Sequence, residues 1–137
     1  MAVSIKSEKE IELMRVSCKN LSVMFDELEK IIKPGVGEIS KEARQLVDVT
    51  RQSFFEGIRY AKAGNHLHDI SAAIQKYAES FGYGVVRELV GHGIGTHLHE
   101  DPQIPNFKTI GRGIRLRPGM TLAIEPMITM GDYAVSV

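Results

Sequence analysis

Apolar residues recur every three or four positions through the first part of the chain, which is the spacing of one face of an α-helix. Ser7 and Glu10 stand at the start of this run in the arrangement of a capping box, and Pro34 followed by Gly35 should end the helix. The apolar positions of this stretch are Ile11, Met14, Leu21, Met24, Leu28, Ile31 and Ile32. The pattern therefore predicts a long amphipathic helix at the start of the chain.

Two further helical patterns follow. Ser40 is suited to cap a helix that runs to about Ala61 and is closed by Gly64, because glycine tolerates the left-handed conformation after a helix C-terminus. A third helix is expected to begin near Asp69 and to end at Gly82. Both helices are apolar along one face, so both should pack against another element.

The last third of the chain favours strands and loops. The range 84–90 is rich in β-branched residues and is predicted as a strand, whereas 91–117 is interrupted by prolines and is predicted as a loop. The ranges 121–129 and 133–137 are two more strand candidates. Helices followed by strands indicate an α+β fold, in which about three helices pack on one face of a small antiparallel sheet.

The length and charge of the chain limit its functional class. A chain of 137 residues suffices for one domain, 1–137, with a leading helix in 1–36 and the remainder of the fold in 37–137. Seventeen basic and seventeen acidic side chains give no net charge, which argues against nucleic acid and anionic membranes as partners. The sequence has no apolar run of membrane-spanning length and no signal-peptide core near its start, so we expect a cytoplasmic protein.

The sulfur-containing side chains are expected in the core. Cys18 is the single cysteine, which excludes an internal disulfide, and its helical surroundings favour a small buried side chain over a reactive thiol. Met14, Met24, Met120 and Met127 are predicted core residues rather than a binding surface. None of these side chains therefore adds candidate chemistry.

Candidate chemistry is concentrated in two histidines and one glutamate. His92 and His99 lie seven residues apart, and Glu125 lies in an apolar strand pattern between Ile124 and Met127. An ionised carboxylate in such surroundings faces a desolvation penalty of several kcal/mol, so it needs a cation, a partner or an exit to water. A divalent metal ion is the simplest of these explanations.

Four of the five histidines also have a simpler interpretation. His92, in a glycine-rich stretch, is by itself more typical of a hydrogen-bonded structural histidine. His97 could join His99 in a ligand cluster, but solvent is the favoured environment for His97. His66 and His68 precede the third helical pattern and are expected at the surface.

Two longer motifs resemble a known enzyme family. The motif GHGIGxxxHEDPxxPNF occupies 91–107, and RLxPGMxLAIEPM occupies 115–127. Together they resemble the second half of type I methionine aminopeptidases, the metal-dependent enzymes that remove the initiator methionine from nascent proteins. The ranges 5–36 and 37–86 also resemble the N-terminal helix of that family and the helices of its second half. The resemblance implies half of the family's pita-bread fold.

The resemblance also implies roles for individual residues. His92 and Glu125 would bind a divalent metal ion, Co²⁺, Mn²⁺, Fe²⁺ or Zn²⁺, and Glu125 would also transfer a proton to the leaving amine. His99 would act in catalysis by hydrogen-bonding the scissile peptide group of an N-terminal methionyl peptide. Leu98, beside it, would contact the methionine side chain of the substrate.

The chain departs from the family pattern in two places. Val36 runs directly into Gly37, where family members have a long segment with two aspartate ligands and another catalytic histidine. The sequence also stops before the family's final strand, which carries a further glutamate ligand. His92 and Glu125 are therefore two of five expected metal ligands, and we expect little or no aminopeptidase activity from this chain alone.

A second function remains open beside peptide hydrolysis. A sheet with half of the family's strands should expose an apolar surface and an unpaired edge. The chain would then be a non-catalytic half-domain that self-associates or binds a peptide or protein partner. A homodimer through the exposed sheet edge is one form that this second function would take.

Overall fold

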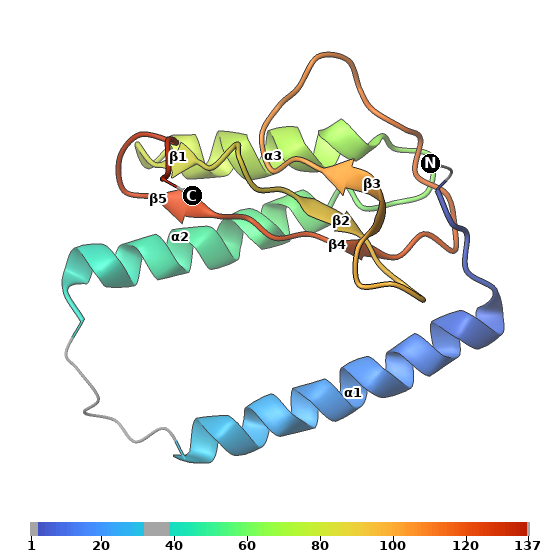
Figure 1. Ribbon diagram of the computed structural model, residues 1–137. Helices are drawn as coiled ribbons and strands as arrows, with labels where there is room; N and C mark the ends of the chain where they lie inside the picture. The colour runs from blue at the N-terminus through green and yellow to red at the C-terminus, as the bar shows by residue number, and fades with distance from the viewer. Residues whose placement is uncertain (1–2, 32–38, 137) are drawn as a thin grey trace.

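The computed structural model describes residues 3–31 and 39–136. This described part contains three helices: α1 (Glu8–Ile31), α2 (Lys41–Ile58) and α3 (Leu67–Glu79). Within the same part, five short strands follow: β1 (Gly84–Val85), β2 (Gly91–Gly93), β3 (Glu100–Ile104), β4 (Leu122–Ala123) and β5 (Ile128–Thr129). In Figure 1, α2 and α3 lie together along the strands, whereas α1 is set apart from them.

The strands form two small antiparallel sheets. β1 pairs with β5, and β2 lies between β3 and β4 in the order β3-β2-β4. His92 on β2 is opposite Gln103 of β3 on one side and Ala123 of β4 on the other. The predicted α+β class is confirmed, although the strands form two sheets rather than one.

Side-chain caps fix the starts of the first two helices. At α1, the backbone N–H of Ser7 donates to Glu10 Oε2 at 2.8 Å, which confirms the predicted capping box. At α2, Ser40 Oγ accepts from the N–H of Ala43 at 3.1 Å, which confirms the predicted N-cap. The expected end of α1 at Pro34 lies outside the described residues.

Other helix boundaries differ from the prediction. α2 ends at Ile58 rather than near Ala61, because the N–H of Ala61 donates to Ile58 O at 3.0 Å in a tight turn. α3 begins at Leu67 rather than at Asp69, because His66 is its N-cap and donates from its N–H to Asp69 Oδ2 at 2.9 Å. Asp69 therefore occupies the third helical position, where an acidic side chain completes the first turn.

The strand prediction is wrong at several points. The range 91–117, predicted as a loop, contains β2 and β3, while 84–90 contributes only β1. The described part of 133–137 contains no strand. Propensity counts against the glycines of β2 and against Pro102 in β3, yet β3 is an edge strand, where a proline costs no ladder bond on its outer side.

The core lies between α3 and the strands. Ile70 and Ile74 of α3 are fully buried, and they pack with the fully buried Ile104 at the end of β3. α2 approaches α3 closely at Gly57, where a Cβ atom would lie 2.6 Å from Ile74 Cγ1. Close packing of the two helices thus gives the strands a rigid support.

α1 exposes side chains that its sequence pattern assigns to a core. Cys18 and Met24, both expected to be buried, are exposed, because α1 lies apart from the layer formed by α2 and α3. None of the helices in the described residues has both the length and the apolar character needed to span a membrane. The expected division after residue 36 falls outside the described residues and stays a prediction.

His66 and His68 are less exposed than predicted. Both side chains are half-buried, because a later loop packs over the start of α3. Thr109 Oγ1 of that loop lies 2.9 Å from His68 Nδ1, and His68 is the second residue of α3 rather than a residue before it. The two histidines therefore belong to the packing of this helix.

The core assignment predicts a specific loss of stability. Ile74→Ala should lower the free energy of unfolding by about 2–5 kcal/mol, because it removes buried methylene groups and leaves a cavity. Ile110 is fully exposed, so Ile110→Ala should change the free energy by less than about 0.5 kcal/mol. Urea denaturation followed by circular dichroism measures both changes. Equal losses in the two variants would contradict this core.

Candidate functional site

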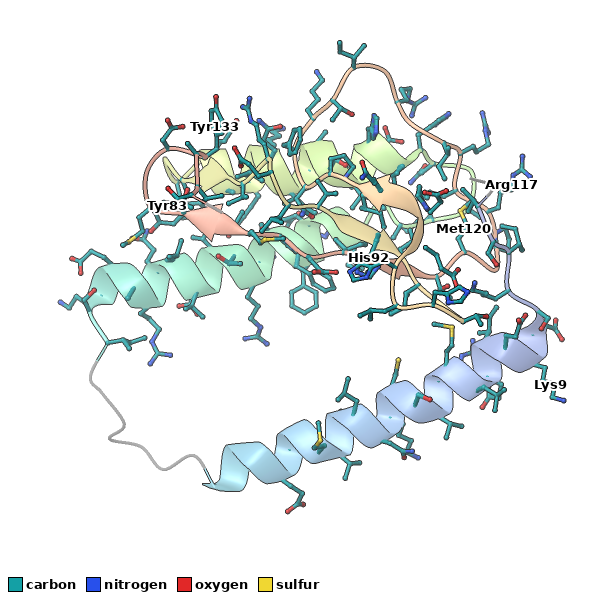
Figure 2. All side chains as sticks on the ribbon, in the orientation of Figure 1. Lys9, Tyr83, His92, Arg117, Met120 and Tyr133 are labelled. Carbon is teal, nitrogen blue, oxygen red and sulfur yellow. The ribbon has the colours of Figure 1, made fainter. Side chains whose placement is uncertain are left out.

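Two glycines place the strand that carries His92 in close contact with its neighbours. A Cβ atom at Gly91 would lie 2.2 Å from Ala123 O, and one at Gly93 would lie 2.2 Å from Asp101 O. Both distances are shorter than van der Waals contact, so these positions require glycine. Figure 2 locates His92 within this strand region.

His92 and Glu125 contact each other directly. His92 Nε2 lies 3.1 Å from Glu125 Oε1, and His92 Nδ1 lies 2.8 Å from Gly93 O. Because a carbonyl oxygen only accepts hydrogen bonds, the proton in the contact with Gly93 O must be on Nδ1. In the neutral ring, Nε2 then directs a lone pair at the carboxylate. Two lone pairs repel each other unless a proton or a cation lies between them.

This arrangement of donor atoms fits a divalent metal ion. A neutral imidazole whose other nitrogen donates to a backbone carbonyl is a usual form of metal-binding histidine. Imidazole nitrogen and carboxylate oxygen bind Zn²⁺ at about 2.0–2.2 Å, so two such donors 3.1 Å apart can share one ion. The alternative is a proton on Nε2, which would make an ion pair of His92 and Glu125.

Glu125 is more exposed than its sequence surroundings predict. It lies between β4 and β5 rather than inside a strand, and its side chain is 48% exposed, against 14% for His92. Water therefore solvates the carboxylate, and the predicted desolvation penalty of several kcal/mol is wrong for this residue. The fully buried Asn106 donates from Nδ2 to Glu125 O at 2.8 Å, which fixes the backbone at this position.

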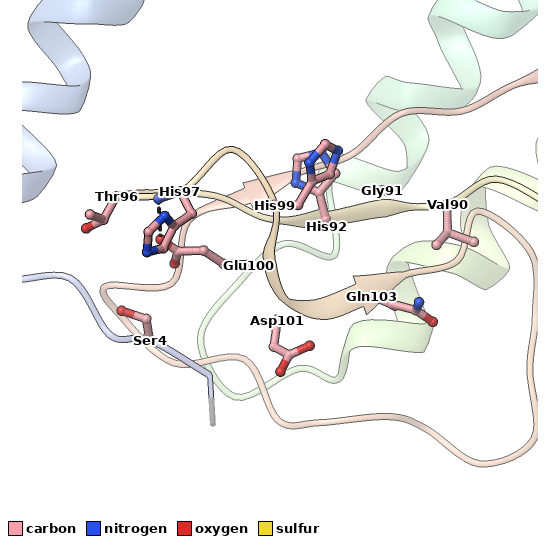
Figure 3. Close-up of a pocket in the computed structure, with 10 residues that line it drawn as sticks. All are labelled: Ser4, Val90, Gly91, His92, Thr96, His97, His99, Glu100, Asp101 and Gln103. Carbon is pink, nitrogen blue, oxygen red and sulfur yellow. Dashed lines mark hydrogen bonds between the residues drawn. The ribbon is translucent and has the colours of Figure 1, made fainter. Parts of the chain in front are cut away.

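A pocket of about 640 Å³ opens beside His92. His99 also lines it, and the centroid of its ring lies 4.2 Å from that of His92 with 53° between the ring planes. Figure 3 shows these two rings together, with His97 well separated from them. Leu98 is 68% exposed on the same loop. The roles of His99 and Leu98 toward a substrate stay predictions.

The candidate ligands form a pair rather than a larger group. Among residues 3–31 and 39–136, no three His, Cys, Asp or Glu side chains are grouped closely enough to hold a metal ion. His97 is exposed, as predicted, although the spacing does not explain this, because residues two apart in an extended segment face the same side. A metal ion at His92 and Glu125 would therefore take its further ligands from water or from groups outside this part of the chain.

One ion pair beside the pocket has no signal in the sequence patterns. Lys6 Nζ lies 2.6 Å from Glu100 Oε2, and Glu100 Oε1 accepts from the N–H of His97 at 3.1 Å. The hydrogen bonds from Lys6 and from the His97 backbone lower the pKa of Glu100 below its ordinary range. Glu100 stands inside a recognisable motif, but nothing in the local sequence of Lys6 indicates its partner.

Comparisons with known proteins match the part of the chain that carries His92 and Glu125. A sequence model described as metallopeptidase family M24 matches residues 35–136. The chain is 59% identical over 100 residues to a methionine aminopeptidase of Clostridium acetobutylicum, a match that covers 73% of this chain and 40% of that protein. It is 52% identical over 100 residues to methionine aminopeptidase 1 of Bacillus subtilis, with the same 73% and 40% covered.

A solved structure agrees with these sequence matches. The crystal structure of methionine aminopeptidase from Thermotoga maritima has a TM-score of 0.71 and 52% sequence identity, and the match covers 74% of this chain and 41% of that one. The chain thus spans about 40% of the length of these relatives, and its fold is one half of the pita-bread fold. The matched family consists of metallopeptidases, which depend on a divalent metal. With the family match extending over most of its sequence, the chain belongs to metallopeptidase family M24.

Proposed function

We propose that the chain binds one divalent metal ion through His92 Nε2 and Glu125 Oε1, as part of a methionine aminopeptidase site. The approach of these two atoms to 3.1 Å, with His92 Nδ1 turned to Gly93 O, is the observation that supports the proposal most strongly. Imidazole and carboxylate ligands suit Co²⁺, Mn²⁺, Fe²⁺ and Zn²⁺. When bound, such an ion supplies a water molecule of lowered pKa for hydrolysis.

The remaining residues of the site would act on the peptide. In this proposal, His99 hydrogen-bonds the scissile peptide group of an N-terminal methionyl peptide, and Glu125 holds the proton that leaves with the amine. The exposed Leu98 contacts the methionine side chain. The adjoining pocket of about 640 Å³ is within the range of small-ligand sites. Nascent proteins are cytoplasmic substrates, so we propose the cytoplasm as the location of this activity.

Hydrolysis by this chain alone is proposed to be slow. His92 and Glu125 match two of the five metal ligands that the resemblance to methionine aminopeptidases implies. Catalytic sites usually hold each ion with three or more protein ligands, and two-metal sites add carboxylates that bridge the ions. Two ligands are therefore expected to give weak metal binding and little catalysis.

Metal binding should stabilise the folded chain. Added Co²⁺, Mn²⁺ or Zn²⁺ should raise the Tm, because a ligand that prefers the folded state stabilises it by mass action. At about 100 times the Kd, the stabilisation is about 2.7 kcal/mol. His92→Ala and Glu125→Gln should each abolish the shift. Differential scanning fluorimetry with and without metal measures it.

His66→Ala is the control for this experiment. His66 caps α3 and does not line the pocket of His92, so this variant should keep the metal-induced shift relative to its own metal-free Tm. An equal shift in all three variants would show that the metal binds elsewhere on the chain.

Peptide hydrolysis should be much slower than in an intact enzyme. The chain alone should release methionine from a Met-Ala-Ser peptide at least about a thousandfold more slowly than a full-length methionine aminopeptidase, since missing catalytic groups cost several kcal/mol of transition-state stabilisation. Chromatographic detection of methionine in Mn²⁺-containing buffer measures both rates, with Glu125→Gln as the background. Turnover close to that of the intact enzyme would refute the slow-hydrolysis proposal.

A second candidate function is self-association as a non-catalytic half-domain. In the described part of the chain, β3 and β4 are the outer strands of their sheet and pair only with β2. Pro102 has no N–H to donate at the edge of β3, so the edge of β4 at Leu122 is more open to pairing with another strand. We propose a homodimer across this edge, in which two copies of His92 and Glu125 approach a common two-fold axis.

Sedimentation velocity tests the homodimer. The mass should rise from one chain to two with increasing concentration, and a stable isologous dimer should bury about 1,600 Å² at its interface. A monomer at every concentration would remove the dimer. The same measurement with Mn²⁺ shows whether metal strengthens the association, as a shared site requires.

A further inference from the structure

A lysine near the start of the chain is buried against the loop that carries His99. We call residues 3–6 the N-terminal strap and residues 95–99 the histidine loop. Lys6 is only 7% exposed, and its Nζ lies 2.6 Å from Glu100 Oε2 and 2.9 Å from Ser4 Oγ. A buried ammonium group is costly without partners, and these oxygen atoms provide them. The strap is thus attached to the residue that directly follows the histidine loop.

Glu100 connects the strap to the histidine loop. One of its carboxylate oxygens accepts from Lys6, and the other accepts from the N–H of His97 at 3.1 Å. Both bonds lower the pKa of Glu100, so the carboxylate is ionised at neutral pH. A single ionised side chain therefore joins a lysine from the strap to a backbone group in the middle of the loop.

Close packing and a main-chain bond hold the strap in place. A Cβ atom at Gly95 would lie 2.2 Å from Lys6 Cε, so the lysine stem lies directly on the backbone of the histidine loop. The N–H of Lys6 donates to Gly119 O at 2.8 Å, shortly before β4 begins. Because the strap is bound on both sides, Lys6 offers the loop a fixed point of attachment.

The linkage reaches the candidate site. Ser4, His97, His99 and Glu100 line the same pocket as His92. Figure 3 shows Glu100 beside His97, while His99 lies with His92. His99 is exposed, so burial does not hold its ring in place beside the His92 ring, whose centroid lies 4.2 Å away. An exposed loop keeps one geometry only where specific contacts restrain it.

We propose that Lys6 is a positioning residue, which holds the histidine loop through Glu100 so that the His99 ring lies against His92 beside the pocket. The consequence for peptide binding rests on the proposed function of His99. A hydrogen-bonding group is sensitive to its position, since a displacement of 1 Å can cost about a hundredfold in rate. Lys6 acts here without touching the peptide.

NMR of the full chain tests the attachment without metal and without activity. Lys6→Met keeps the length of the side chain and removes its charge, while Glu100→Gln keeps the shape of the carboxylate. Both should lower the heteronuclear NOE of amides 95–99 and move the imidazole signals of His99, with the amide signals of α3 unchanged. Lys62→Met, which alters an exposed lysine, is the matched control and should change none of these signals.

A charge exchange distinguishes the ion pair from general packing. Loop order means here the heteronuclear NOE of amides 95–99. The double variant Lys6→Glu with Glu100→Lys should regain a large part of the loop order that Lys6→Met or Glu100→Gln removes. Loop order equal to wild type in both Lys6→Met and Glu100→Gln would overturn the proposal. If Lys6→Met unfolds, Glu100→Gln decides the matter, because it preserves the buried lysine stem.

Peptide binding separates this inference from the proposed function. In Mn²⁺, Lys6→Met should weaken the binding of Met-Ala-Ser about tenfold and leave the Mn²⁺ affinity unchanged within about twofold, because it displaces His99 and spares His92 and Glu125. A wild-type chain that binds neither probe refutes the proposed function, and the loop order measured by NMR still decides the role of Lys6. Equal peptide affinity and equal loop order in wild type and Lys6→Met would overturn the inference.

Discussion

β3 and β4 approach β2 so closely at Gly91 and Gly93 that a methyl group at either position would collide with a main-chain oxygen of the neighbouring strand. The spacing of these three strands determines where His92 lies, because His92 is the residue between the two glycines. The bond from the His92 ring to Gly93 O then fixes which nitrogen faces Glu125. The chemistry proposed for the site therefore depends on a backbone contact that only glycine permits.

Helix α3 packs against these strands and supports their arrangement. Its apolar face buries Ile70 and Ile74 against β3, and its Ser71 hydroxyl donates to Pro105 O at 2.5 Å. The next residue, Asn106, donates to the backbone of Glu125. A continuous set of buried contacts thus runs from the helix to the candidate ligand. The Glu125 side chain is free to be solvated while its backbone is held.

Features that depend on neighbouring residues were predictable from the sequence, and those that depend on distant residues were not. Ser7 and Ser40 cap their helices as predicted, because a cap is satisfied within one turn. β2 and β3 were missed, because strand pairing across the chain outweighs the poor propensity of glycine and proline. Lys6 and Glu100 lie 94 positions apart, and no periodicity joins them.

In the candidate site, too, the sequence predicted some features and not others. His92 and Glu125 were found through motifs, and the structure brings them together, whereas the burial assigned to Glu125 was wrong because the chain leaves the strand before reaching it. Alternating apolar residues indicate a strand but do not give its end. Cys18 and Met24 were misassigned for a related reason: an amphipathic pattern shows that a face is apolar, and does not show what covers it.

Anomalous diffraction from a crystal of the chain grown with Mn²⁺ tests whether His92 and Glu125 hold a metal ion, because it locates the ion itself. We expect a peak between His92 and Glu125, at about 2.0–2.2 Å from the imidazole nitrogen and the carboxylate oxygen. His92 Nδ1 should keep its bond to Gly93 O in that crystal. A direct contact of His92 with Glu125 that persists at saturating Mn²⁺, with no peak beside it, would show that a proton joins the two residues and would contradict the metal site.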